Sequence, residues 1–166
     1  MKRLFTVIGV VVLALAASGL LVAQSDPFSG TWKFSVAKSK FKPGPPYKSE
    51  TRTNLRARMT GTDAGDVYKA SVERVNADGS PQQYRYSAKY DGKDYPITGQ
   101  GPNGADTIAI KRIDANTVQA TAQKASKVLF TTKAVVTKDG SVMTFTSKGT
   151  DASGQRFNNV VVYDKQ

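Results

Sequence analysis

The chain has 166 residues, of which 24 are Lys or Arg and 13 are Asp or Glu, and it contains neither His nor Cys. This length predicts a single ordinary domain, and a hydrophobic share of 39% is enough to build a core. The absence of Cys excludes disulfides, thiolate metal sites and a Cys nucleophile, and the absence of His removes the commonest general base and metal ligand.

The first 23 residues have the pattern of a secretory signal peptide. The basic pair Lys2-Arg3 precedes an apolar run that ends in small residues, which is the order typical of such signals. We expect cleavage after Ala23, with cleavage near Ser18 as an alternative. An uncleaved anchor is a further alternative, because residues 4–23 are about as long as a membrane-crossing helix needs to be.

The mature chain is expected to be one domain over residues 24–166, with no later segment apolar enough to span a membrane. It contains no cysteine for a disulfide and no Asn-x-Ser/Thr glycosylation site. Both features favour a bacterial protein that is periplasmic or secreted.

Short runs rich in β-branched and aromatic residues alternate with turn signals along the rest of the chain, while residues 37–47 are expected to form a loop. The expected strands are 31–36, 49–59, 67–75, 82–90, 94–98, 107–113, 117–124, 128–137, 141–148 and 156–163. Such short connections exclude a parallel sheet, which needs long crossovers. We predict an all-β fold, an antiparallel up-and-down meander closed into a β-barrel, with a β-sandwich as the alternative.

Side chains alternate between the two faces of a strand, so each run predicts an inner and an outer face. The residues expected to point inward include Tyr84, Tyr86, Ala88, Tyr90, Val128, Phe130, Thr132, Ala134, Val136, Met143, Phe145, Val161 and Tyr163. A wall of aromatic, small and hydroxyl side chains suits a barrel with an internal pocket, although the rings would equally well fill the interior. The candidate ligand-binding residues are Tyr84, Tyr86, Phe130 and Phe145.

Residues 28–33, Phe-Ser-Gly-Thr-Trp-Lys, resemble the Gly-x-Trp opening of the lipocalins and fatty-acid-binding proteins, which together form the calycins. Gly30 and Trp32 match that motif residue by residue. The resemblance implies a lipocalin-like barrel that binds a small ligand, with no reaction attached. It implies that Trp32 packs at one end and that an Arg of the last strand packs on it, for which Arg156 is the candidate. The chain also resembles an uncharacterised group of exported bacterial proteins around residues 26–48 and 149–160.

Few residues are placed for proton transfer, and we predict that the protein is not an enzyme and holds no cofactor or metal. Most Asp residues lie in predicted turns, and the pair Glu50 and Glu73 is expected on the solvated surface. Residues 99–104 read Gly-x-Gly-x-x-Gly, but the dinucleotide fingerprint requires a helix to follow. We therefore expect a glycine-rich loop at a barrel mouth.

The remaining signal is a basic excess, with a formal net charge of +11 that becomes +9 without Lys2 and Arg3 (11 − 2 = 9). The basic residues expected on outer strand faces are Arg52, Arg56, Arg58, Arg74, Arg85, Lys89, Lys111, Lys124 and Lys133. Such a surface is attracted to anionic envelope material such as lipid headgroups or acidic polysaccharide. No motif supports a specific nucleic-acid role.

These observations predict an exported binding protein that holds a small hydrophobic or amphipathic ligand inside its barrel. The alternative is a non-catalytic basic envelope protein that interacts with anionic lipid or polysaccharide surfaces.

Overall fold

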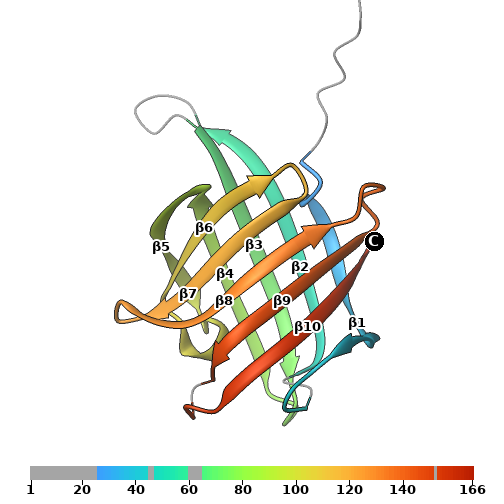
Figure 1. The fold of residues 1–166 in the computed structure, drawn as a ribbon, viewed down its shortest axis with the longest axis vertical. Helices are drawn as coiled ribbons and strands as arrows, with labels where there is room; N and C mark the ends of the chain where they lie inside the picture. Colours follow the sequence, from blue (N-terminus) through green and yellow to red (C-terminus); the bar gives the residue numbers. More distant parts are fainter. Residues whose placement is uncertain (1–25, 45–46, 60–64, 152) are drawn as a thin grey trace, which may run out of the picture.

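The computed structural model describes residues 26–44, 47–59, 65–151 and 153–166, which form a closed antiparallel barrel (Figure 1). The strands are β1 (Gly30–Lys40), β2 (Tyr47–Met59), β3 (Gly65–Asn76), β4 (Pro81–Lys89), β5 (Asp91–Gly99), β6 (Thr107–Asp114), β7 (Thr117–Lys124), β8 (Lys127–Val136), β9 (Val142–Thr150) and β10 (Arg156–Lys165). The expected signal peptide, residues 1–23, lies outside the described residues.

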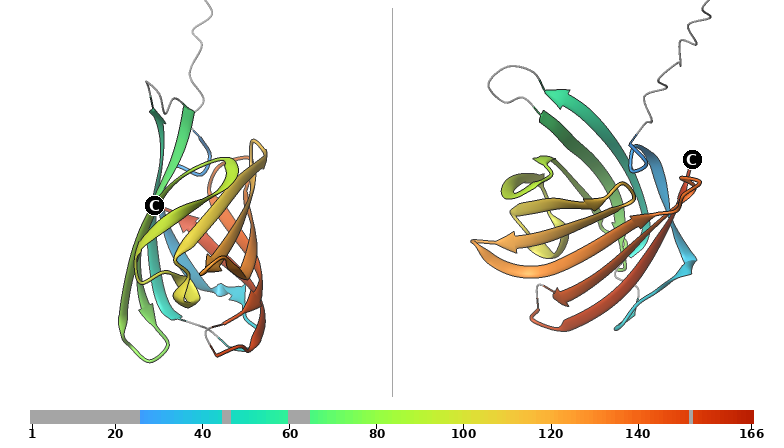
Figure 2. Two further views of the ribbon diagram at one scale, coloured as in Figure 1. Left: turned by 90° about the vertical axis from the view of Figure 1, so that its left-hand side faces the viewer. Right: turned by 45° about the horizontal axis from the view of Figure 1, so that its top comes forward.

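Each strand pairs with its neighbours in chain order, and β10 pairs with β1 to close the ring. Figure 2 shows the strands wrapping around a common axis. The predicted up-and-down barrel is confirmed, and the sandwich alternative is wrong. The expected loop over residues 37–47 is wrong at its start, because β1 continues to Lys40 through an irregularity in its pairing with β10 after Ser35.

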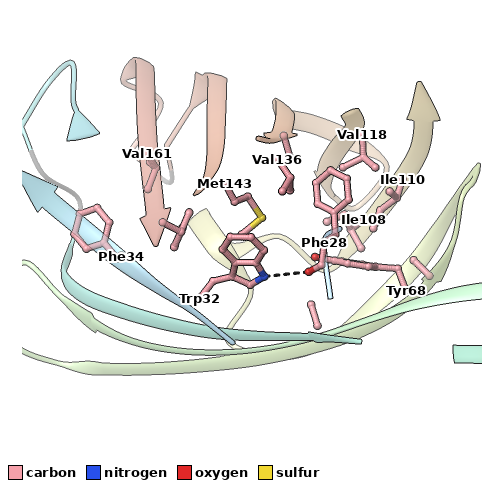
Figure 3. Close-up of a cluster of buried hydrophobic side chains, with 14 of the residues drawn as sticks. Phe28, Trp32, Phe34, Tyr68, Ile108, Ile110, Val118, Val136, Met143 and Val161 are labelled. Atoms are coloured by element: carbon pink, nitrogen blue, oxygen red, sulfur yellow. Dashed lines mark hydrogen bonds between the residues drawn. The ribbon is translucent and has the colours of Figure 1, made fainter. Parts of the chain in front are cut away.

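One end of the barrel, here named the closed end, is sealed by the turn over residues 26–29. The indole Nε1 of Trp32 donates a hydrogen bond of 3.0 Å to the carbonyl oxygen of Phe28, and the amide of Asn54 donates to the same oxygen at 3.2 Å. Figure 3 shows Trp32 facing Phe28 and packed against Met143 in the core. Trp32 is 0% exposed, and it lies beside the turn that seals the closed end.

The basic residue over Trp32 is Lys165, not Arg156. Lys165 is the register partner of Trp32, and its Nζ lies 5.2 Å from the centroid of the indole ring. Arg156 begins β10 at the opposite end of the barrel. Gly30 fits this arrangement because its φ is +129° and because a Cβ there would lie 2.7 Å from Cε of Lys165.

The aromatic and aliphatic residues expected to point inward do so with one exception, Val128, and the face expected for β2 is also wrong, because Arg52 points inward. Ala122 pairs with Phe130, but the next residue of β7 pairs with Val128, so Leu129 is an extra residue in β8. Such a bulge turns the side chains before it to the other face. Val128 is therefore 53% exposed, whereas Phe130 still faces the interior.

Candidate functional site

A cavity of about 430 Å³ occupies the barrel interior. Phe28 forms its floor at the closed end, and its walls are mostly aromatic and aliphatic side chains from β2 through β10. All four candidate residues, Tyr84, Tyr86, Phe130 and Phe145, line this cavity. Their contact with a ligand stays a prediction.

The cavity reaches the opposite end of the barrel, here named the open end. Its lining there includes Pro43 from the β1–β2 connection, Pro102 and Asn103 from the β5–β6 connection, and Asp151 after β9. The glycine-rich segment 99–104 thus lies at the rim. It contains only a three-residue helical turn, η2 (Pro102–Gly104), and β6 follows it, so the structure required for a dinucleotide fingerprint is missing there.

The rings of Phe130 in β8 and Phe157 in β10 meet at the open end, because the residue of β9 that lies between them is glycine. Gly149 pairs with both Phe130 and Phe157, and the two ring centroids lie 5.7 Å apart. A Cβ at Gly149 would lie 2.3 Å from that of Phe130. A larger residue would therefore separate these rings.

The pairing between neighbouring strands is shortest between β4 and β5. These strands pair over only three residue pairs, the last of which is Tyr86 with Ile97. Tyr86 lines both the interior cavity and an outer groove that includes Leu55 and Pro96. It is the one predicted ligand-binding residue that borders both hollows.

The interior also contains a group of charges, here named the Glu50 cluster: Glu50 and Arg52 from β2, Arg74 from β3, Tyr47 from β2 and Tyr163 from β10. The carboxylate of Glu50 accepts hydrogen bonds from Nε of Arg74 and from the hydroxyl of Tyr163, each at 2.7 Å. Tyr47 and Tyr163 share a hydrogen bond of 3.2 Å between their hydroxyls. Glu50 is 1% exposed, so its negative charge is fully enclosed by these partners.

The two arginines of the cluster differ in how well they are paired. Arg74 bonds Glu50 and, through Nη1, the side-chain oxygen of Gln82 at 3.3 Å, and its guanidinium lies 4.1 Å from the ring centroid of Tyr47. Arg52 is 3% exposed, its Nη1 is 3.5 Å from Glu50, and its buried Nε has no hydrogen-bond partner. Arg52 lies over the ring of Phe145 at 4.6 Å.

Burial and these charges fix the protonation of the cluster. Burial alone would raise the pKa of Glu50, but the charges of Arg74 and Arg52 and the hydrogen bond from Tyr163 hold that pKa below its ordinary value. Burial raises the pKa of Tyr84 to about 12 and also raises the pKa of Tyr47. At neutral pH Glu50 is therefore ionised and these hydroxyls are neutral, so the cluster is suited to hydrogen bonding and charge pairing.

Two expectations about charged residues are wrong. Arg52 and Arg74 belong to the interior and not to the outer basic face, and Glu50 is buried instead of solvated. Glu73 is exposed and pairs with Thr51, whereas Glu50 pairs with Arg74 on the inner face. The two carboxylates thus point to opposite sides of the sheet and cannot act across one cleft.

Sequence reasoning missed the Glu50 cluster because it assigned charged residues to solvent by type. The inward position of Arg52 follows from the strand register, since Arg52 lies opposite Trp32 in the sheet and directly paired residues share a face. That register depends on how β1 and β2 pair, which the loop length between them does not fix.

Within the described parts of the chain, no group of three or more Asp or Glu side chains could hold a metal ion. None of the described helices is long and apolar enough to cross a membrane. Comparison of the sequence with models of known protein families and with curated proteins finds no match. The resemblance to the calycins therefore stays a prediction from residues 28–33.

Proposed function

We propose that this protein is an exported, periplasmic or secreted binding protein that holds a small hydrophobic or amphipathic molecule inside its barrel. The observation that supports this most is the cavity of about 430 Å³, which falls in the range of small-molecule sites. It is closed by Phe28 at one end and reaches the rim at the other. Its walls are mostly apolar, and their polar side chains include Arg52, Arg74, Thr132 and Ser147.

The arrangement of the cluster argues for binding without catalysis. Glu50, the buried carboxylate beside the cavity, is held by Arg74 and Tyr163, and its low pKa makes it a poor proton acceptor. The alternative role at anionic envelope surfaces loses two of its expected contributors, Arg52 and Arg74. The outer strand faces retain exposed Arg85, Lys111 and Lys133 among others.

The test is titration of the periplasmic protein with N-phenylnaphthylamine, a neutral probe whose fluorescence rises in an apolar site. We expect a saturable rise with one site per chain. Ala120→Phe should weaken binding at least about tenfold, because Ala120 lines the cavity and the added ring occupies its volume.

Gln119→Phe is the matched control, because Gln119 is the preceding residue on β7 and is exposed on the outer face. It should bind the probe as the unmodified protein does. Circular dichroism of both variants shows whether each is folded. No saturable binding to the unmodified protein, or an equal loss in both folded variants, would overturn the proposed function.

A further inference from the structure

Three polar side chains form a short row on the cavity wall, here named the polar row: Thr132 of β8, Ser147 of β9 and Asn159 of β10. Thr132 pairs with Ser147, and Ser147 pairs with Asn159, so the three residues lie side by side on adjacent strands. The Cβ atoms of such directly paired residues are about 5 Å apart. The row is therefore narrow enough for one small group of a ligand to touch all of it.

The polar row has hydrogen-bond donors that the rest of the protein does not use. The hydroxyls of Thr132 and Ser147 share one hydrogen bond of 2.7 Å, which uses only one of their two hydrogens. Asn159 accepts from the backbone N–H of Lys42 at 3.0 Å through Oδ1, and its Nδ2 donates to no atom in the described part of the chain. The row can therefore donate to an oxygen that enters the cavity.

The unpaired Nε of Arg52 does not offer the same possibility. That nitrogen is buried among protein atoms, while Nη1 lies 3.5 Å from Glu50 and the side chain shares a hydrogen bond with Tyr86. Ser147 and Asn159, by contrast, are only partly buried although they point into the barrel. Their remaining accessible surface borders the cavity, so their polar atoms are within reach of a ligand.

The surroundings of the polar row are apolar on both sides along the barrel axis. The next inward residues on the same three strands are Ala134, Phe145 and Val161 toward the closed end and Phe130, Gly149 and Phe157 toward the open end. The donors between these two apolar levels are hydroxyl and amide groups, which carry no charge. They match an uncharged acceptor, whose removal from water costs far less than that of an ion.

We propose that the polar row binds an uncharged oxygen, such as a ketone or ester carbonyl, in the middle of an apolar ligand. This inference rests on the proposed function and names its ligand class. The carbonyl oxygen accepts from the free hydroxyl hydrogen and from Nδ2 of Asn159, and the apolar parts on its two sides lie against the two apolar levels. A ligand with its carbonyl near one end would leave one of these levels unfilled.

The first experiment compares dibutyl ketone with heptyl methyl ketone as competitors of N-phenylnaphthylamine at neutral pH. The two ketones have the same composition and differ only in the position of the carbonyl. We expect dibutyl ketone to bind about fivefold more tightly, because it buries apolar carbons on both sides of the row while the carbonyl is hydrogen-bonded. Equal affinities, or tighter binding of heptyl methyl ketone, would overturn this inference.

The second experiment removes the two hydroxyls of the row together, by Thr132→Val with Ser147→Ala. Replacing both partners of a buried hydrogen bond leaves neither unpaired, so the fold should be retained. We expect this double variant to bind dibutyl ketone about fivefold more weakly and N-phenylnaphthylamine unchanged. The matched control is Thr131→Val with Thr146→Ala, because these neighbouring positions on the same strands face outward. It should retain both affinities.

The outcomes separate this inference from the proposed function. No loss of affinity for dibutyl ketone in the double variant, or an equal loss for the ketone and the probe, would overturn the inference and leave the proposed function standing. If the double variant does not fold by circular dichroism, the comparison of the two ketones on the unmodified protein decides alone. Failure of the unmodified protein to bind the probe would overturn the proposed function itself.

Discussion

Buried charged residues lie both at the closed end and in the interior of the barrel, but the ratio of carboxylate to guanidinium groups differs between the two regions. At the closed end one carboxylate, Asp26, meets one guanidinium, Arg112, and also accepts from the hydroxyl of Tyr90 and the backbone of Phe28. In the Glu50 cluster two guanidinium groups share one carboxylate. Carboxylate and guanidinium groups of this pair are equal in number at the closed end, which only seals the barrel. The excess positive charge of the Glu50 cluster lies beside the cavity, where there is room for another molecule.

The aromatic residues of the two ends show the same difference. Trp32 and Phe28 are almost completely buried and joined by a hydrogen bond. Phe130 and Phe157 touch each other at the open end yet remain partly exposed. The first pair completes a core, and the second borders a space that the protein itself does not fill.

The largest effect is expected from Trp32→Ala, which removes the centre of the closed end. Deleting a fully buried aromatic side chain costs about 3–5 kcal/mol in the free energy of unfolding, and here it also removes the hydrogen bond to Phe28. Phe157→Ala should cost less than half as much, because that ring is partly exposed. Urea unfolding followed by circular dichroism measures both, and equal losses would contradict the contrast between the two ends.

Glu50→Gln should have the next largest effect, a loss of about 3 kcal/mol in the free energy of unfolding. The substitution keeps the shape of the side chain but leaves two buried guanidinium groups without their counter-charge. Glu73→Gln, on the exposed face of β3, should change stability by no more than about 0.5 kcal/mol. Similar values for the two variants would show that the cluster is not structural.

The contribution of Glu50 to the free energy of unfolding depends on pH, and the pKa of Glu50 determines the direction of that dependence. The pKa of Glu50 is lower in the folded protein than its ordinary value of 4.5. Its contribution to stability is therefore complete above about pH 4.5 and is lost as the pH falls through the folded pKa. The difference in unfolding free energy between the unmodified protein and Glu50→Gln should be constant near neutrality and shrink in acid.

The barrel could be predicted from the sequence because its strands and turns are specified locally. Asp78, Asp139 and Asp151 lie in turns, as predicted for most of the Asp residues, and each accepts a hydrogen bond from the backbone N–H two residues later. Alternation then placed Tyr84, Tyr86, Phe130 and Phe145 on the cavity wall without knowledge of any partner strand.

The Glu50 cluster could not be found in this way, because it depends on contacts between distant strands. Along β2 the inward positions are Glu50, Arg52 and Asn54, while Leu55 is exposed. Hydrophobicity alone gives the wrong face for this strand. The interior position of these polar residues becomes evident only from their partners on other strands, which are Trp32 in β1, Arg74 in β3 and Tyr163 in β10.

The smallest expected effect tests the bulge that displaced Val128. Val128→Thr places a hydroxyl on the outer face beside solvent, so the free energy of unfolding should change by less than about 0.5 kcal/mol. Val136→Thr makes the same chemical change in the same strand, but Val136 is 2% exposed, and burying a hydroxyl without a partner there should cost about 1–3 kcal/mol. Without the bulge both residues would share the inner face, since they are separated by an even number of positions. Equal losses in urea unfolding would therefore place Val128 in the interior and remove the extra residue at Leu129.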